Sequence, residues 1–245
     1  MTPEREARLL EVFRRRQTDL TLITDKVHKT RNIAALVRNC DAVGISDLHY
    51  VEPPEGYRTY RGTAMGSERW VEQHRHESTE SAIAAVKAKG MRVFAAHLSP
   101  TAVDFHEVDY TQPCAILMGA EKAGVSEVGA QLADQHIVIP MLGMVESLNV
   151  ATASGIILAE AQYQRQKAGL YQREGLDLER RARYLFEARY PRLVKFCQLC
   201  EEPYPHYNER GELVDPPSVQ ALVRRGLVLE AAQPKKCPRN RFKVS

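Results

Sequence analysis

Apolar, strand-like runs alternate with helical patterns between residues 20 and about 141, and this alternation limits the chain to few folds. The helical patterns lie at 32–43, 79–89 and 125–133, and glycines such as Gly44 and Gly90 mark helix ends. Strands that alternate with helices form a parallel sheet covered on both faces, so the predicted fold class is α/β. The strand candidates are residues 20–27, 47–51, 71–76, 91–98, 114–118 and 136–141.

Helical patterns and a polar tail flank this region. Residues 3–17 fit a short basic amphipathic helix, a long helix starts at Leu148, and a further helical stretch covers about 178–201. The chain beyond Pro203 is rich in proline, glycine and charge, which predicts a loosely ordered tail. The predicted organisation is an N-terminal basic helix (1–19), an α/β domain (20–165), a C-terminal helical extension (166–202) and a basic tail (203–245).

Composition narrows the classes of protein. Of the 245 residues, 44% are hydrophobic and 27% charged, as is typical of globular domains. No apolar run is long enough to cross a bilayer, and the first residues lack the apolar core of a secretory signal. Five cysteines without framework spacing favour reduced thiols. We therefore expect a cytoplasmic protein with no membrane partner.

The net charge of +3 conceals two basic ends. Near the amino terminus, five arginines outweigh three glutamates: Arg5, Arg8, Arg14, Arg15 and Arg16. Towards the other end, residues 165–195 hold nine Lys or Arg against four acids, and the tail after Pro234 holds five basic residues and no acid. Each cluster alone is explained by solvated helix faces with i, i+4 ion pairs. Basic clusters at both ends together favour a nucleic acid as partner.

Polar residues follow the predicted strands where each strand ends. The apolar run at 136–141 leads through Gly143 to Ser147 and Asn149, at the start of a long helix. The run at 114–118 leads into Gly119-Ala-Glu-Lys-Ala-Gly124-Val-Ser126, with Glu121 inside the loop. The strand ends at 95–98, 118–121 and 139–149 are predicted to converge on one side of the sheet, where open α/β sheets bind ligands, so they predict a small-molecule site.

Asn32 and Arg38 lie on one predicted helix, six residues apart, and so do not share a face. Taken alone, Asn32 is best explained as a cap of this helix. Arg38 lies among Leu36, Val37 and Cys40, and an arginine in so apolar a helix predicts a carboxylate or phosphate partner.

The sequence does not carry the complete motif of a P-loop, of a Rossmann dinucleotide site or of a zinc site. Val125 occupies the position of the P-loop lysine, which excludes nucleoside triphosphate hydrolysis, and no Gly-x-Gly-x-x-Gly follows the early strands. A metabolic Rossmann enzyme is therefore unsupported. Four residues resemble a zinc-ligand set, but their irregular spacing disfavours a metal site. They are Cys197, Cys200, His206 and Cys237.

These motifs resemble, in order, those of the SpoU family of RNA 2′-O-ribose methyltransferases in the SPOUT superfamily. The chain is most similar to the TrmH branch, which methylates a guanosine in the D-loop of tRNA, at position 18. The resemblance implies a parallel sheet with a deep trefoil knot, at about 92–160, that forms the S-adenosylmethionine pocket. It also implies a homodimer whose active sites lie at the subunit interface, and a reaction that needs no metal.

Site residues carry over by position. Arg38 would be the catalytic arginine, with the rest of the catalytic site made by Asn32, Glu121, Ser147 and Asn149. Contacts to the methyl donor would come from Ala96, Leu98, Gly119, Ile139, Met141 and Leu148. Contacts to tRNA would come from Arg8, Arg16, Arg165 and Arg173. Tyr163 stands where relatives often have another arginine.

The resemblance implies in-line transfer of a methyl group from the sulfonium to a ribose 2′-hydroxyl, helped by positioning of the reactants. Arg38 would either accept the hydroxyl proton or stabilise the developing alkoxide, and both roles stay open. The alternatives are an rRNA 2′-O-methyltransferase of the same family and a non-catalytic RNA-binding protein. Only about thirty residues precede the first motif, which favours tRNA because the rRNA enzymes commonly carry an extra N-terminal domain.

Overall fold

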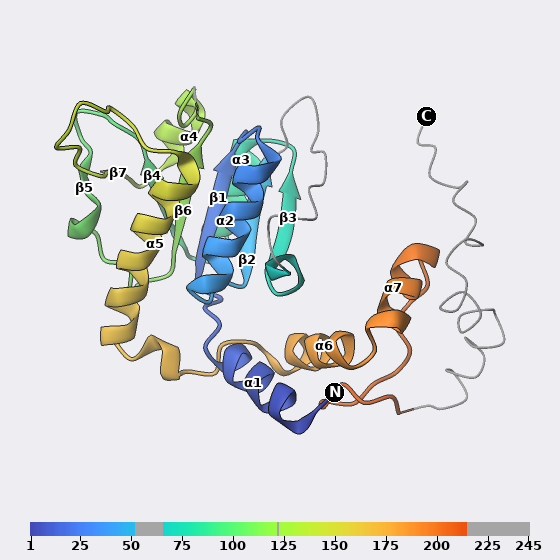
Figure 1. Ribbon diagram of the computed structural model, residues 1–245. Coiled ribbons are helices and arrows are strands. Elements are labelled where there is room, and N and C mark those ends of the chain that lie inside the picture. The colour runs from blue at the N-terminus through green and yellow to red at the C-terminus, as the bar shows by residue number, and fades with distance from the viewer. Residues whose placement is uncertain (52–65, 122, 215–245) are drawn as a thin grey trace, which may run out of the picture. The chain divides into compact units, whose positions relative to one another are not determined.

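The structure, a computed structural model, describes residues 1–51, 66–121 and 123–214 (Figure 1). Cys237 and most of the predicted basic tail lie outside the described residues. The chain divides into a compact unit of residues 12–176 and a second unit made of 1–11 with 177–245. Among the described residues, no helix is long and apolar enough to cross a membrane.

Seven parallel strands form the sheet of the larger unit, in the order β3-β2-β1-β6-β4-β7-β5. The predicted parallel sheet is therefore confirmed. β7 comes late in the chain but pairs on one side with β4 and on the other with β5. The strands are β1 (Leu20–Asp25), β2 (Asp47–Val51), β3 (Glu72–His76), β4 (Arg92–Ala96), β5 (Val103–Asp104), β6 (Cys114–Gly119) and β7 (Gln135–Val138).

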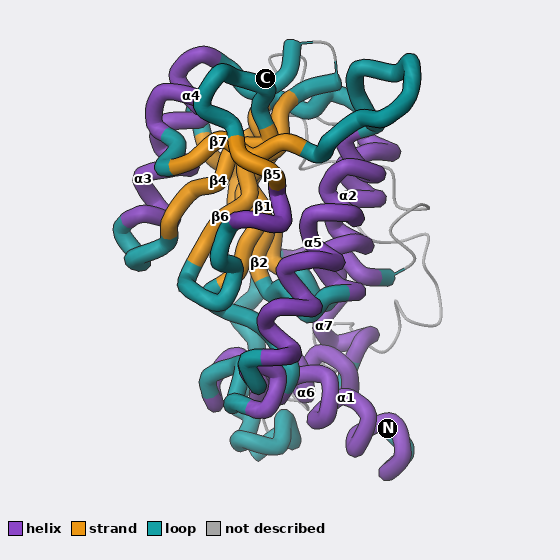
Figure 2. Tube along the Cα trace, turned by 90° about the vertical axis from the view of Figure 1, so that its left-hand side faces the viewer, coloured by secondary structure: helices purple, strands orange, loops and turns teal. Residues whose placement is uncertain are grey.

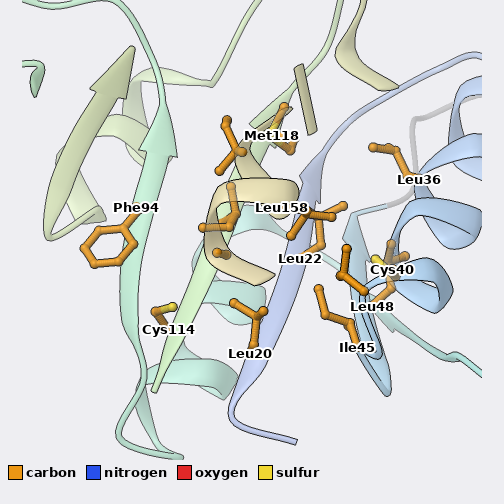
Figure 3. Close-up of a cluster of buried hydrophobic side chains, with 14 of the residues drawn as sticks. Leu20, Leu22, Leu36, Cys40, Ile45, Leu48, Phe94, Cys114, Met118 and Leu158 are labelled. Carbon is orange, nitrogen blue, oxygen red and sulfur yellow. The ribbon is translucent and has the colours of Figure 1, made fainter. Parts of the chain in front are cut away.

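Helices cover both faces of this sheet. Figure 2 shows α2 (Thr30–Ala42) and α5 (Val150–Lys167) on one face, and α3 (Thr79–Lys87) and α4 (Glu127–Leu132) on the other. The first face holds the larger apolar cluster, where Leu36 and Leu158 pack on Leu22 and Met118 (Figure 3). Central strands such as Cys114–Gly119 are apolar throughout because side chains on both of their faces are buried.

The smaller unit contains helices and the ordered beginning of the tail. α6 (Leu178–Arg189) and α7 (Pro191–Cys200) replace the single predicted helix, because Pro191 disfavours helical geometry at Tyr190 and starts a new helix. α1 (Pro3–Arg14) begins in this unit, where Glu6 accepts a 2.5 Å hydrogen bond from Arg189. Within the tail, the ring of Tyr207 stacks on Phe186, so residues 203–214 pack on α6.

Candidate active site

A cavity of about 210 Å³ lies at the carboxyl ends of β4, β6 and β7. Its walls come from the three segments predicted to converge (95–98, 118–121 and 139–149), from residues next to them, and from Ala153 and Ile157 of α5. All six residues predicted to contact a methyl donor line this cavity, as do Glu121 and Ser147. The six are Ala96, Leu98, Gly119, Ile139, Met141 and Leu148.

The loop after β6 forms one wall and depends on two glycines. The main chains of Ala120 and Gly124 pair through hydrogen bonds of 3.0 and 2.8 Å, and Gly124 has a φ of +68°. A Cβ atom on Gly119 would lie 2.0 Å from the carbonyl carbon of Gly124, so no other residue fits there. The close approach that these glycines permit is therefore made within their own loop.

A buried carboxylate holds the end of the same loop. Asp25, at the end of β1, accepts hydrogen bonds of 2.7 Å from the backbone N–H of Ser126 and from the hydroxyl of Thr79. The side chain of Ser126 in turn caps α4 by accepting from the N–H of Gly129. Sequence analysis did not select Asp25, although an acidic residue at the end of an apolar strand was a usable signal.

Three polar side chains from different elements meet beside the cavity. The side-chain amide of Asn32 donates to Glu121, and that of Asn149 donates to the side-chain oxygen Oδ1 of Asn32 at 3.5 Å. Asn149 also caps α5 by accepting from the N–H of Ala151. The prediction that Asn32 caps its helix is wrong, because Lys29 is the N-cap of α2 and Asn32 is buried against Glu121.

Arg38 lies on the exposed side of α2 and is absent from the cavity wall. Leu36, Val37 and Cys40 instead face the core. Within the described parts of the chain, Arg38 has no carboxylate partner, contrary to one form of the sequence prediction. The helical period explains the difference, because residues adjacent in sequence lie on different faces of a helix.

The four arginines predicted to contact RNA fall into two groups. Arg8 and Arg173 are exposed, although Arg8 also forms an ion pair with Glu11 at 2.9 Å. Arg16 is 1% exposed and donates to Asp41 and to the carbonyl of Ile45, and its Nε atom has no partner among the described residues. Neither Arg16 nor Arg165 is open to a phosphate in this structure.

Arg165 is fully buried in the larger unit. It donates to Asp19, to the side-chain oxygen of Gln17 at 2.9 Å and to the carbonyl of Tyr110 at 3.0 Å. Burial of a guanidinium group is tolerated when it is paired with a carboxylate and each of its nitrogens has an acceptor, as here. Arg165 therefore holds α5 to the start of β1.

His97, which sequence analysis missed, also lines the cavity. Burial and the nearby His136 ring lower the pKa of His97 below its usual value. The zinc candidates do not assemble in the described residues, where the one group of three possible metal ligands is formed by Asp47, Glu72 and His74.

A family model described as the SpoU rRNA Methylase family matches residues 19–159, and one described as SpoU, rRNA methylase, C-terminal matches residues 163–216. The tRNA (guanosine(18)-2'-O)-methyltransferase of Escherichia coli (strain K12) is 48% identical over 215 residues, which are 87% of this chain and 94% of that relative.

Two solved structures extend the comparison. The TrmH/SpoU tRNA modifying enzyme of A. aeolicus superposes with a TM-score of 0.67 and 42% identity, over 72% of this chain and 90% of its own. The SpoU methyltransferase AviRb from Streptomyces viridochromogenes, in complex with the cofactor AdoMet, superposes with a TM-score of 0.55 and 27% identity. That match covers 64% of this chain and 65% of AviRb.

Proposed function

Because the chain belongs to the SpoU methylase family, we propose that it transfers a methyl group from S-adenosylmethionine to the ribose 2′-hydroxyl of a guanosine in tRNA, at position 18. The observation that carries this proposal is the cavity at the ends of β4, β6 and β7, which gathers all six expected donor contacts. The E. coli relative, matched over 94% of its length, favours tRNA over rRNA as the substrate.

The cavity residues fit a methyl donor of this kind. The lining of the cavity is largely apolar and includes Ala96, Ile139 and Leu148. It carries few polar side chains, as is typical of small-molecule sites. S-adenosylmethionine, when bound, supplies an electrophilic methyl group, so the proposed reaction needs no metal. The AdoMet complex of AviRb supports the same choice of donor.

Within this reaction, Asn32, Glu121 and Asn149 position the reactants. The donation from Asn32 fixes the carboxylate of Glu121 at the cavity wall, and Asn149 joins this pair to the start of α5. Ser147, exposed at the rim, is available to bind the substrate or the donor. A site held in this way limits the motion of the reactants, which lowers the barrier to transfer.

Arg38 is proposed to act on a second copy of the chain. It does not line the cavity of its own chain, and exposed apolar side chains surround that cavity: Leu98 is 78% exposed, Leu142 100% and Met144 99%. Exposed apolar groups of this kind mark contact surfaces. We propose that a homodimer covers them and that Arg38, across the interface, either stabilises the developing alkoxide or accepts the proton of the ribose 2′-hydroxyl.

A mixing experiment tests the shared site. Arg38→Ala and Gly119→Ala, whose added Cβ displaces the loop that forms a wall of the cavity, should each have little activity as homodimers at a donor concentration below the Kd of the Gly119 variant. Mixed and allowed to exchange subunits, they should recover about a quarter of wild-type activity, because half of the dimers are mixed and each has one intact site. An inactive mixture that contains mixed dimers would show that Arg38 acts within its own chain.

The proposed basic surfaces are the N-terminal segment 1–19 and the helical extension 166–202. Arg8 and Arg173 are the exposed members of the predicted set, and we propose them as tRNA contacts. Their loss should weaken tRNA binding and lower its salt dependence. We also propose a cytoplasmic location, which the free thiols of the four cysteines in the described residues support.

The trefoil knot is proposed for residues 92–160. The position of β7 between β4 and β5 supports it, because the chain enters a gap bordered by earlier segments. Such threading departs from the usual absence of knots. An experimental chain trace through these residues tests it.

Methyl transfer from labelled donor to purified tRNA and rRNA, followed by mapping of the modified nucleotide, tests the function. We expect label on the 2′-oxygen of one tRNA guanosine. Label on a base would contradict ribose methylation, and label in rRNA alone would establish the alternative substrate. Failure to bind the donor in calorimetry would favour a non-catalytic RNA-binding protein.

A further inference from the structure

One face of the β2–β3 ladder carries five side chains that can bind a metal ion. Asp47 lies opposite Glu72 in the register, and His49 lies opposite His74, with His76 two residues further along β3. Alternate residues of a strand share a face, so these side chains lie together. The ladder is at the other end of the strand order from the cavity of the proposed active site.

Three of these side chains have the spacing of a ligand set. One oxygen each of Asp47 and Glu72 and one ring nitrogen of His74 all lie within 4.8 Å of one another. His74 Nε2 is 2.6 Å from Asp47 Oδ1. In a tetrahedral site with bonds of about 2.0–2.1 Å, ligand atoms are about 3.3 Å apart, so small side-chain rotations would bring all three onto one ion.

His49 supplies a second observation beside this cluster. The side chain is 3% exposed, its ring stacks on that of His74, and its Nδ1 is 2.8 Å from His76 Nε2. In the described parts of the chain, its Nε2 atom is buried without a hydrogen-bond partner. A buried imidazole nitrogen without a partner is costly, so this end of the ladder holds an unsatisfied polar atom next to the three possible ligands.

We propose that Asp47, Glu72 and His74 bind a divalent transition-metal ion such as Zn²⁺, with the buried His49 ring packed beside them. Imidazole and carboxylate groups are ordinary Zn²⁺ ligands. The ion also removes the repulsion between two carboxylates that face each other across the ladder. It links β3, an edge strand, to β2, and so stabilises the sheet without a part in methyl transfer.

Calorimetric titration of Zn²⁺ into the metal-stripped full-length protein tests this site. We expect one bound ion per chain, and at free Zn²⁺ of 100 Kd the unfolding equilibrium constant should fall by about 100-fold. Glu72→Gln and His74→Gln should weaken binding by more than the ~10–100-fold that loss of an outer-shell partner costs. The control is His106→Gln, which removes an exposed histidine paired with Glu160 at 3.0 Å and should leave binding unchanged.

Several outcomes would overturn the proposal. If Zn²⁺ does not bind, or if Glu72→Gln and His74→Gln keep wild-type affinity, these side chains form a hydrogen-bonded network and not a metal site. Co²⁺ in place of Zn²⁺ should give no thiolate charge-transfer band, and a band lost in Cys200→Ser would assign the ion to cysteine. Glu72→Gln is nearly isosteric, so circular dichroism should show that it is folded. Its Zn²⁺ affinity therefore tests the site even if His74→Gln does not fold.

Discussion

Gly119→Ala adds one methyl group where β6 enters the loop that forms a wall of the cavity. The new Cβ would lie 2.0 Å from the carbonyl carbon of Gly124, 2.1 Å from the N of Val125 and 2.3 Å from the O of Gly124. All three are main-chain atoms, so no side-chain rotation relieves the contact. The loop must move away by more than about 1 Å to reach ordinary van der Waals contact.

The cost follows from what that movement disrupts. Overpacking costs about 1–3 kcal/mol, and the two Ala120–Gly124 hydrogen bonds contribute about 0.5–1.5 kcal/mol each. The sum of about 2–6 kcal/mol is below the stability of many domains, so the variant should fold with a Tm at least about 4 °C lower. Because Gly119, Ala120, Glu121 and Gly124 all line the cavity, donor affinity should fall more than tenfold.

Differential scanning calorimetry and isothermal titration with S-adenosylmethionine measure both effects. Gly143→Ala is the matched control, because its added Cβ meets no atom within 4 Å and its backbone is not left-handed. It should change stability by less than about 0.5 kcal/mol. If Gly119→Ala has the Tm of Gly143→Ala and wild-type donor affinity, the account of this loop is incorrect.

Three further predictions follow from the same contacts. Asn32→Ala leaves Glu121 without its amide donor, so the free energy of unfolding, measured by chemical denaturation, should fall by about 1–3 kcal/mol. The rate of methyl transfer should also fall, and unchanged values for both would exclude a positioning role. Arg165→Ala removes a buried guanidinium group and should lower the free energy of unfolding by about 3–5 kcal/mol. Arg173 is exposed, so Arg173→Ala should change that free energy by less than about 0.5 kcal/mol while it weakens tRNA binding. Equal stabilities of the two variants would contradict the burial argument. The lowered pKa of His97 means that the folded state favours the neutral ring, so its contribution to stability is present above about pH 6.5 and is lost as pH falls below that value. Donor binding should weaken only at a lower pH, where the ring is protonated in the folded protein, because a protonated ring would repel the sulfonium. His97→Gln should abolish that dependence in a calorimetric pH series.

Elements with a strong local pattern were predictable from the sequence. The strand expected at 47–51 has those bounds in the structure, and the run expected at 114–118 ends one residue later, at Gly119. Both are apolar or alternating runs that end at turn signals. β5 was not predicted, because its two residues, Val103 and Asp104, are too few to show an alternating hydrophobic pattern. The break between α6 and α7 was foreseeable from Pro191, which was not weighed against the helical pattern around it.

Site residues were predictable where their place at the end of a strand brings them to the cavity. They were less predictable where burial depends on a partner far away in the sequence. Residues at strand ends, such as Glu121 and Ser147, reach the cavity because parallel strands end at one edge of the sheet. The buried state of Arg165 depends on Asp19, which lies 146 residues away in sequence. No local charge pattern indicates such a pair, so a count of basic residues overstates the surface available to RNA.

The late position of β7 also affects how the protein is made. β4 and β5 leave the ribosome before residues 135–138, so their facing edges stay unpaired while synthesis continues. Unpaired edges recruit other strands, and pairing between distant segments is slow. The nascent chain is therefore most exposed to aggregation between translation of Asp104 and of Val138, and substitutions that delay this last insertion should reduce soluble yield even when the finished fold tolerates them.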